Sequence, residues 1–164
     1  MSEIVSTRKL TQEEFTAYRN EVVEKYCEEL VGTDSVASAE EARAFAETEV
    51  SRLLPVGVDL DCLNLNVMVN DKGEDVGFLW HEKRHILEMD VAFIYDILVY
   101  ENHRKKGYGQ RIIAYLAEAA KKEGLGKIVL NVFAKNAAAN ALYERMGFEV
   151  IAEAKGQKAM IKHL

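Results

Sequence analysis

Alternating and helical spacings of apolar side chains both occur along this chain. Apolar and polar positions alternate over Leu63–Val69 and again over Asp75–Glu82, as in half-buried strands. Asn70–Gly73, between them, has the composition of a tight turn, so the three segments predict a hairpin. Apolar positions recur at helical spacing over Thr11–Leu30 and Gly107–Glu123. The pattern predicts an α+β or mixed α/β fold.

Residues that begin and end helices define the other elements. Thr11 and Glu14 have the spacing of a capping box. The only proline, Pro55, ends a second predicted helix at Ala37–Leu54, and Gly32–Ser35 separates it from the first helix. The remaining predicted elements are strands at Ile4–Leu10, Val91–Tyr100, Lys127–Phe133, Phe148–Ala152 and Lys158–Lys162 and a short helix at Ala137–Met146.

Length and composition predict a single domain over residues 1–164. Apolar residues make up 49% and charged residues 29% of the chain, as is usual in globular proteins. There is no apolar run of about 18 residues, the length that a membrane helix needs, and the first residues lack the apolar stretch of a signal peptide. We therefore expect a cytoplasmic protein in which Cys27 and Cys62, which form no metal or redox motif, are reduced thiols.

The segment His81-Glu82-Lys83-Arg84-His85 matches the H-E-x-x-H pattern of zinc proteases. The pattern binds zinc only on a helix, where positions four residues apart share one face. No helical spacing surrounds this segment, which follows a predicted strand and precedes another. On a strand the two histidines would lie about 13 Å apart, too far to share a metal. We therefore expect solvated hairpin residues here and no metal site.

Charge is distributed unevenly along the chain, whose net charge is −6. Residues 1–82 carry 18 acidic and 7 basic side chains, whereas residues 83–164 carry 9 acidic and 14 basic ones. An acidic protein without a long basic stripe is not expected to bind nucleic acid. The basic half could still hold a small polyanion, and the acidic half could attract a cation.

The candidate polyanion site is the loop before the helix that starts near Gly107. Arg104-Lys105-Lys106 precedes Gly107 and Gly109 at this helix N-terminus, where unpaired N–H groups favour phosphate oxygens. Glycine lets a phosphate approach the main chain closely. A dinucleotide fingerprint would need a third glycine where Ile112 stands, and the Gly-Lys-Ser/Thr of a Walker A loop is absent.

The segment Arg104-x-x-Gly107-x-Gly109 resembles the pyrophosphate loop of the GNAT family of N-acetyltransferases. Asn136–Phe148 looks like the N-x-x-A-x-x-L-Y-x-x-x-G-F segment of the same family. Both occur in the family's order, and the resemblance covers nearly the whole chain, as in small bacterial-type members. It implies a twisted mixed sheet of about seven strands flanked by about four helices, with splayed central parallel strands.

The same resemblance implies acetyl-CoA as co-substrate, with no metal. Its pantetheine would lie between Tyr95–Val99 and Lys127–Phe133, where these two strands separate. The Leu98 N–H would polarise the acetyl carbonyl, and the Asn136 amide would reach the pantetheine. The cofactor-binding residues implied in this way are Ile97, Leu98, Val99, Arg104, Lys105, Lys106, Gly107, Tyr108, Gly109, Gln110, Asn131, Asn136 and Tyr143.

Acetyl transfer to an amine needs an oxyanion donor, an acid for the leaving thiolate and a group that takes a proton from the amine. Tyr143 matches the family's tyrosine acid; a tyrosine there could also simply pack on the sheet. The family's ribosomal-protein acetylating members have a glutamate where this chain has Asn131, which cannot accept a proton. Asp96, Asp90 and Glu88 are the candidate bases, acting directly or through water, although each could be a solvated strand-end carboxylate.

These residues predict direct attack of a primary amine on acetyl-CoA in a ternary complex. Residues 13–49, whose helices border the acceptor in the family, carry 11 acidic and 3 basic side chains, which favours a small cationic amine. The alternatives are a protein or peptide acetyltransferase acting on a chain terminus or a lysine, and a non-catalytic acetyl-CoA-binding module. The expected partners are therefore a small amine or a peptide amine, with no nucleic acid and no membrane, in a possible homodimer.

Overall fold

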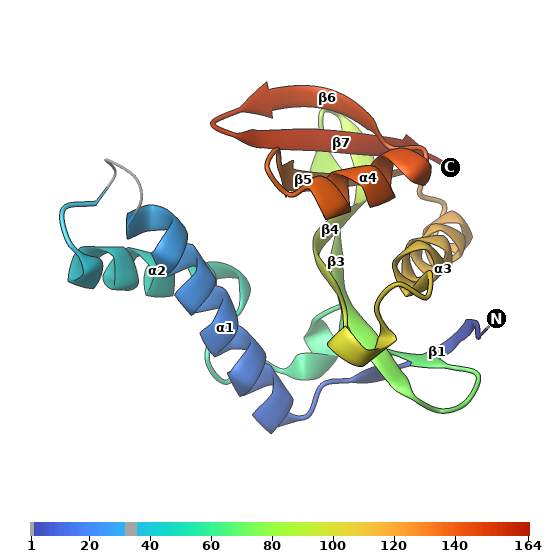
Figure 1. Cartoon of the computed structure of the whole chain (residues 1–164), viewed down its shortest axis with the longest axis horizontal. Coiled ribbons are helices and arrows are strands. Elements are labelled where there is room, and N and C mark those ends of the chain that lie inside the picture. The colour runs from blue at the N-terminus through green and yellow to red at the C-terminus, as the bar shows by residue number, and fades with distance from the viewer. Residues whose placement is uncertain (1, 32–35) are drawn as a thin grey trace. The chain divides into compact units, whose positions relative to one another are not determined.

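The structure is a computed structural model that describes residues 2–31 and 36–164, so the predicted break at Gly32–Ser35 lies outside the described residues. Seven strands form one mixed sheet in the order β1-β2-β3-β4-β5-β7-β6 (Figure 1). The strands are β1 (Ile4–Lys9), β2 (Leu65–Asn70), β3 (Asp75–Ile86), β4 (Met89–Val99), β5 (Lys127–Phe133), β6 (Glu149–Ala154) and β7 (Gln157–His163). The helices are α1 (Gln12–Val31), α2 (Ala39–Leu53), α3 (Tyr108–Lys122) and α4 (Ala137–Arg145), with short 3₁₀ turns η1 (Leu60–Cys62) and η2 (Glu101–His103).

The chain divides into two compact units. The larger unit, Met1–Lys9 with Leu63–Leu164, contains the sheet, α3 and α4, and the smaller unit, Leu10–Cys62, contains α1 and α2. In the larger unit, α3 and α4 cover one face of the sheet, where buried side chains of both helices share a core cluster with the strands. That cluster includes Ile112, Leu116, Tyr143, Ile128 and Met160. A second cluster, built from side chains of β4, β5 and β7, lies on the other face.

The parallel central strands β4 and β5 separate after three residue pairs. They pair from Ala92↔Ile128 to Ile94↔Leu130, although β4 continues to Val99. The separation begins at a bulge, because the partners of β4 on β3 change from His81↔Ile94 to Trp80↔Asp96 and leave Tyr95 as the extra residue. The predicted splay of the central strands is confirmed.

In the smaller unit, a buried arginine links α1 to α2 and to the residue that ends it. Arg19 of α1 is 6% exposed and donates hydrogen bonds to the Leu54 carbonyl at 2.8 Å and to the Ser51 hydroxyl at 2.7 Å. It also forms an ion pair with Glu47 at 3.1 Å. The predicted capping box is confirmed, because Thr11 N–H donates to Glu14 at 2.9 Å and Glu14 N–H donates to the Thr11 hydroxyl at 3.2 Å.

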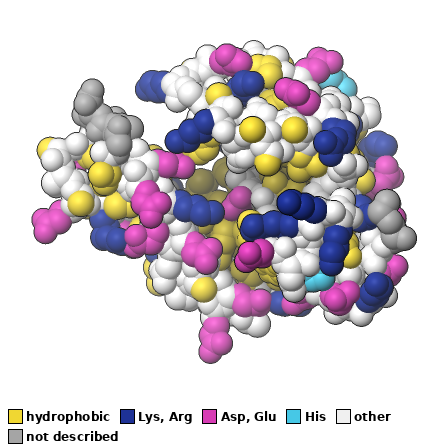
Figure 2. All heavy atoms as spheres, viewed as in Figure 1, with side chains coloured by type: hydrophobic (Ala, Val, Ile, Leu, Met, Phe, Trp, Pro, Cys, Tyr) yellow, Lys and Arg dark blue, Asp and Glu magenta, His cyan; other side chains and the backbone are white. Residues whose placement is uncertain are grey.

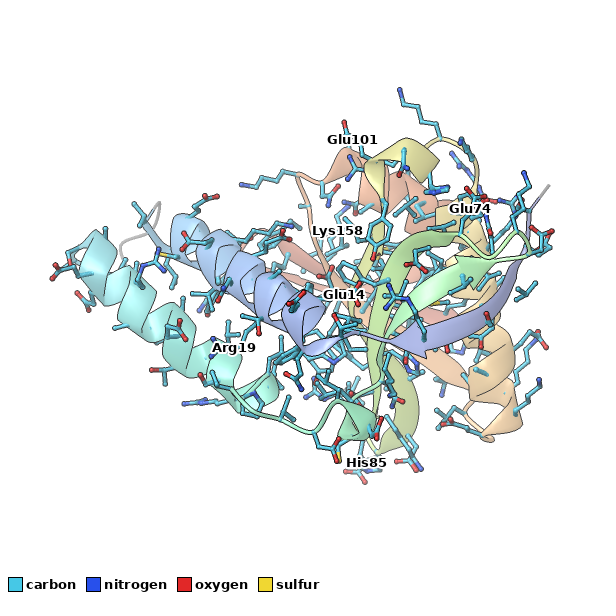
Figure 3. The ribbon with its side chains drawn as sticks, turned by 90° about the horizontal axis from the view of Figure 1, so that it is seen from below. Glu14, Arg19, Glu74, His85, Glu101 and Lys158 are labelled. Atoms are coloured by element: carbon cyan, nitrogen blue, oxygen red, sulfur yellow. The ribbon has the colours of Figure 1, made fainter. Side chains whose placement is uncertain are left out.

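The strand β3 is longer than predicted and contains the whole His81–His85 segment. A two-residue turn at Leu87 and Glu88, both with positive φ, connects it to β4. His85 pairs with Asp90 at 2.9 Å and lies at the end of this hairpin far from Glu101 (Figure 3). The segment is therefore strand, as its surroundings predicted. Among residues 2–31 and 36–164, no helix is long and apolar enough to cross a bilayer.

Candidate active site

Two hydrogen bonds fix the direction of the β4 main chain at the splay. Tyr100 N–H donates to the Val76 carbonyl of β3 at 2.9 Å. Main-chain groups in an antiparallel ladder alternate between the two sides of a strand, so those of Leu98 also face β3 and those of Ile97 and Val99 face away from it. The Val99 carbonyl accepts a hydrogen bond from Arg104 Nε at 3.0 Å, on the side away from β3.

This register corrects the role expected for Leu98. Its carbonyl lies against Gly77 of β3, and its N–H is directed to the same strand. The ladder therefore argues against the Leu98 N–H as the group that polarises an acetyl carbonyl. The main-chain groups on the open side of β4 belong to Ile97 and Val99, two residues that the sequence also indicated, and of these the Val99 carbonyl is bonded to Arg104.

Tyr143 of α4 lies where the splayed strands open. It is 6% exposed, and the centroid of its ring lies 5.5 Å from that of Phe148. Its hydroxyl has no hydrogen-bond partner in the described parts of the chain. Burial, and secondly the charge of Asp96, raise the pKa of Tyr143 to about 12. The phenol consequently stays protonated at neutral pH and can act as a proton donor.

Of the three candidate bases, only Asp96 lies beside Tyr143, since both line one cavity. Asp90 lies six residues before Asp96 in β4, which is about 20 Å at roughly 3.3 Å per residue of a strand. Glu88 lies further away, in the hairpin turn that precedes β4. A hydrogen bond from His85, and then the Lys83 charge, hold the pKa of Asp90 below its usual range. The structure therefore removes Asp90 and Glu88 as candidates for this site.

Two asparagines, Asn131 of β5 and Asn136 at the start of α4, line the same opening as Asp96 of β4. Asn136 is the N-cap of α4, where its side-chain oxygen accepts from Ala139 N–H at 3.2 Å, which leaves its NH₂ group for a ligand. Asn131 of β5 is exposed and lines the same cavity as Asp96 and Tyr143. Asn140, which the sequence did not indicate, fixes this corner by donating to the carbonyls of Phe133 at 2.9 Å and Asn136 at 2.7 Å.

The basic loop enters α3 through a left-handed glycine. Gly107 has φ of 81° and precedes Tyr108, the first residue of the helix. The first helical hydrogen bond at this end runs from Arg111 N–H to the Gly107 carbonyl at 3.3 Å, so the preceding N–H groups have no acceptor in the helix. Figure 2 shows Lys and Arg side chains gathered over the start of α3.

The second glycine of the motif has a packing role. A Cβ atom on Gly109 would lie 3.0 Å from Leu142 Cδ2, so α3 and α4 meet closely there. A bulky residue at this position would therefore push against α4 next to Tyr143, in addition to obstructing a phosphate. Leu142 and Arg111 are further site residues that the sequence analysis missed. A signal for Arg111 was its place in the first turn of the helix, four residues after Gly107.

Three cavities follow one another along these residues. The first, of 220 Å³, lies between the splayed strands and is lined by Tyr95, Asp96, Asn131, Asn136 and Tyr143 among others. The second, of 550 Å³, shares Ile97, Asn136 and Tyr143 with it and extends to Arg104 and Gly109. The third, of 580 Å³, is lined by Lys105, Lys106, Gly107, Gln110, Arg111, Ala114 and Met146. A protonated phenol is thus at one end of the row and cations with free N–H groups are at the other.

No group of three or more His, Cys, Asp and Glu side chains in the described residues could hold a metal ion. The donors present are instead main-chain groups, an amide, a phenol and basic side chains. Such a set suits an elongated ligand with a polar arm and phosphates.

Comparison with known proteins agrees with this arrangement. The sequence model of the Acetyltransferase (GNAT) family matches residues 39–148. The uncharacterized N-acetyltransferase YycN of Bacillus subtilis (strain 168) is 36% identical over 138 residues, 84% of this chain and 87% of YycN. YdgE of the same organism, also named an uncharacterized N-acetyltransferase, is 32% identical over 85% of this chain and 88% of its own length.

Solved structures show the same fold. The crystal structure of YycN superimposes with a TM-score of 0.69 at 32% identity, covering 92% of this chain and 97% of YycN. The PaiA N-acetyltransferase of Thermoplasma acidophilum, in complex with coenzyme A, has a TM-score of 0.65 at 16% identity, covering 97% of this chain and 98% of PaiA. The chain belongs to the GNAT family of N-acetyltransferases, enzymes that use acetyl-CoA to acetylate amines. The expected family, fold and co-substrate are thereby confirmed.

Proposed function

We propose that acetyl-CoA lies along the three cavities, with its acetyl thioester beside Tyr143 and its pyrophosphate at the start of α3. The single observation that carries this proposal is the buried Tyr143 side chain, which lines two of the cavities. The pantetheine arm would bond to the open main-chain groups of Ile97 and Val99 and to the NH₂ group of Asn136. Arg104 must then leave the Val99 carbonyl, which it occupies in this structure.

The acceptor amine attacks the acetyl carbonyl directly. A nitrogen–carbon bond forms, the carbon–sulfur bond breaks, and the Tyr143 hydroxyl gives its proton to the departing CoA thiolate. The attacking nitrogen, which has released its ammonium proton to solvent before the attack, then loses one more proton to Asp96, or to water next to it, and that proton returns to the Tyr143 phenolate. A main-chain N–H on the open side of β4, that of Ile97 or Val99 and not that of Leu98, would polarise the carbonyl.

The loop residues Arg104–Gln110 would bind the pyrophosphate. Support comes from the left-handed Gly107, the unbonded N–H groups that follow it and the Lys105 and Lys106 side chains that line the third cavity. Arg111 lines this cavity as well, so we add it to the expected phosphate ligands.

We propose a small cationic amine as the acceptor. The support is the surface of α1 and α2 in the smaller unit, where acidic side chains far exceed basic ones. Two of the three basic residues in 13–49 are ion-paired, Arg19 with Glu47 and Arg43 with Glu24, and the 11 acidic side chains still leave a net negative charge. Figure 3 labels Glu14 and Arg19 on α1.

Acetyl-CoA binding tests the proposed placement. The co-substrate should raise the melting temperature, because binding to the folded state alone adds about 2.7 kcal/mol of stability at one hundred times Kd. Replacing Lys105 and Lys106 together by Ala should lower this shift. As a matched control, Lys121→Ala and Lys122→Ala at the other end of α3 should leave the shift unchanged. Equal shifts in both double variants would overturn the placement of the pyrophosphate.

A further inference from the structure

Tyr108, the first residue of α3, is hydrogen-bonded to the turn between β2 and β3, which is distant in sequence. Tyr108 lies between the two glycines of the loop and is 6% exposed. Its hydroxyl accepts a hydrogen bond at 3.0 Å from Nδ2 of Asn70, the last residue of β2, which is 1% exposed. Thirty-eight positions of sequence separate the two residues.

Asn70 is itself fixed by its own turn. Its side-chain oxygen accepts from Lys72 N–H at 3.0 Å and from Glu74 N–H at 2.9 Å, and its Nδ2 also donates to the Glu74 carboxylate at 3.1 Å. Glu74 is labelled at this turn in Figure 3. The amide therefore has one orientation, which presents its nitrogen to Tyr108.

The ring of Tyr108 is also held on its sides. The buried His103 of η2 contacts it edge-on at 5.7 Å, and the Arg111 guanidinium lies 5.3 Å from its centre. Arg111 in turn donates to the Lys106 carbonyl at 2.9 Å. Tyr108 is thus the point at which the turn, the loop and the first turn of α3 are joined.

We infer that Asn70 is a positioning residue for acetyl-CoA: by holding Tyr108 it aims the free N–H groups of Tyr108, Gly109 and Gln110 at the pyrophosphate. This inference rests on the proposed placement of the pyrophosphate. A small displacement of these N–H groups weakens phosphate binding, because hydrogen bonds depend steeply on angle. The role predicts a loss that depends on the pyrophosphate of the acetyl donor, so a donor without the pyrophosphate should not show it.

Kinetics with two acetyl donors distinguish this positioning role from a purely structural one. Acetyl-CoA carries the pyrophosphate, whereas S-acetylpantetheine does not. Asn70→Ser keeps an oxygen for the turn but is too short to reach Tyr108. It should raise KM for acetyl-CoA about fivefold, the worth of one buried hydrogen bond, and leave kcat within about twofold. For S-acetylpantetheine, kcat/KM should match the wild-type value.

Tyr108→Phe removes the other partner of the same bond and should raise KM for acetyl-CoA similarly. Both changes together should cost little more than either alone, because they break one interaction. Tyr115→Phe, on the same helix, is the matched control and should leave KM and kcat/KM unchanged with both acetyl donors. Equal losses with both donors, or additive effects of the two variants, would overturn the role of Asn70. If replacing Lys105 and Lys106 also leaves KM for acetyl-CoA unchanged, the proposed placement fails; if that change raises KM and Asn70→Ser does not, only the inference fails.

Discussion

Gly77 of β3 and Leu98 of β4 approach so closely that a Cβ atom on Gly77 would overlap the Leu98 carbonyl oxygen. At the level of this contact β4 no longer pairs with β5, because their pairing ends at Ile94. The contact holds the Leu98 main chain against β3 and leaves the groups of Ile97 and Val99 directed to the opening. A glycine that looks ordinary in a strand thus determines which side of β4 is available to a ligand.

Gly77→Ala should therefore destabilise the fold and weaken acetyl-CoA binding together. The added methyl group forces the two strands apart, at a cost of about 1–3 kcal/mol. Chemical denaturation and acetyl-CoA titration measure the two effects. Gly126→Ala is the control, since a Cβ atom there meets nothing within 4 Å. If Gly77→Ala binds acetyl-CoA as tightly as wild type, the β4 main chain does not depend on this contact.

The phenol of Tyr143 should titrate far above neutral pH. Burial and Asp96 raise its pKa to about 12, so Asp96→Asn should lower that pKa partway toward 10. Difference absorbance of tyrosinate between each protein and its Tyr143→Phe counterpart isolates this group. An unchanged titration in Asp96→Asn would mean that the carboxylate does not act on the phenol.

The same shift has a consequence for stability. Because the pKa is higher in the folded state than in the unfolded state, the folded protein binds the proton more tightly. The resulting stabilisation is complete below about pH 10 and is lost as pH rises toward about 12. The free energy of unfolding should fall with pH in this window more steeply for wild type than for Tyr143→Phe. Parallel curves would contradict the raised pKa.

The features that could be predicted from sequence are local ones. The capping box at Thr11 and Glu14, the strand β5 and the loop around Gly107 each depend on neighbours in the chain, and the structure has them as predicted. The splay of the central strands was also expected, through the family resemblance. The family motif indicated Tyr143, whose burial and cavity position agree with the role proposed for it.

The remaining features depend on register between distant segments. The direction of the Leu98 N–H is set by its pairing with Phe78 and by the bulge at Tyr95, and neither can be read from the apolar run of β4. Asp90 looked as suitable a base as Asp96 because the position of the hairpin turn was not known. The bond between Asn70 and Tyr108 joins two turns that no local pattern connects.

Added salt should lower kcat/KM for a cationic acceptor. If the acidic helices raise the local concentration of such an amine, kcat/KM for a multivalent amine should fall between about 0.02 and 0.5 M salt, as the Debye length shortens from roughly 20 to 4 Å. A neutral amine measured in parallel should change little. The same salt dependence for both amines would leave the charge of α1 and α2 without a role in substrate choice.

Amine-dependent release of CoA thiol by wild type and by Tyr143→Phe tests the central claim most directly. A panel of primary amines at saturating acetyl-CoA identifies an acceptor, and the variant is then compared on it, with acetyl-CoA affinity measured for both proteins. Loss of a positioned proton donor should lower kcat by roughly 10²–10³ and leave the Kd for acetyl-CoA nearly unchanged. A variant that binds acetyl-CoA and turns over like wild type would contradict the account, because Tyr143 would then be only a packed side chain.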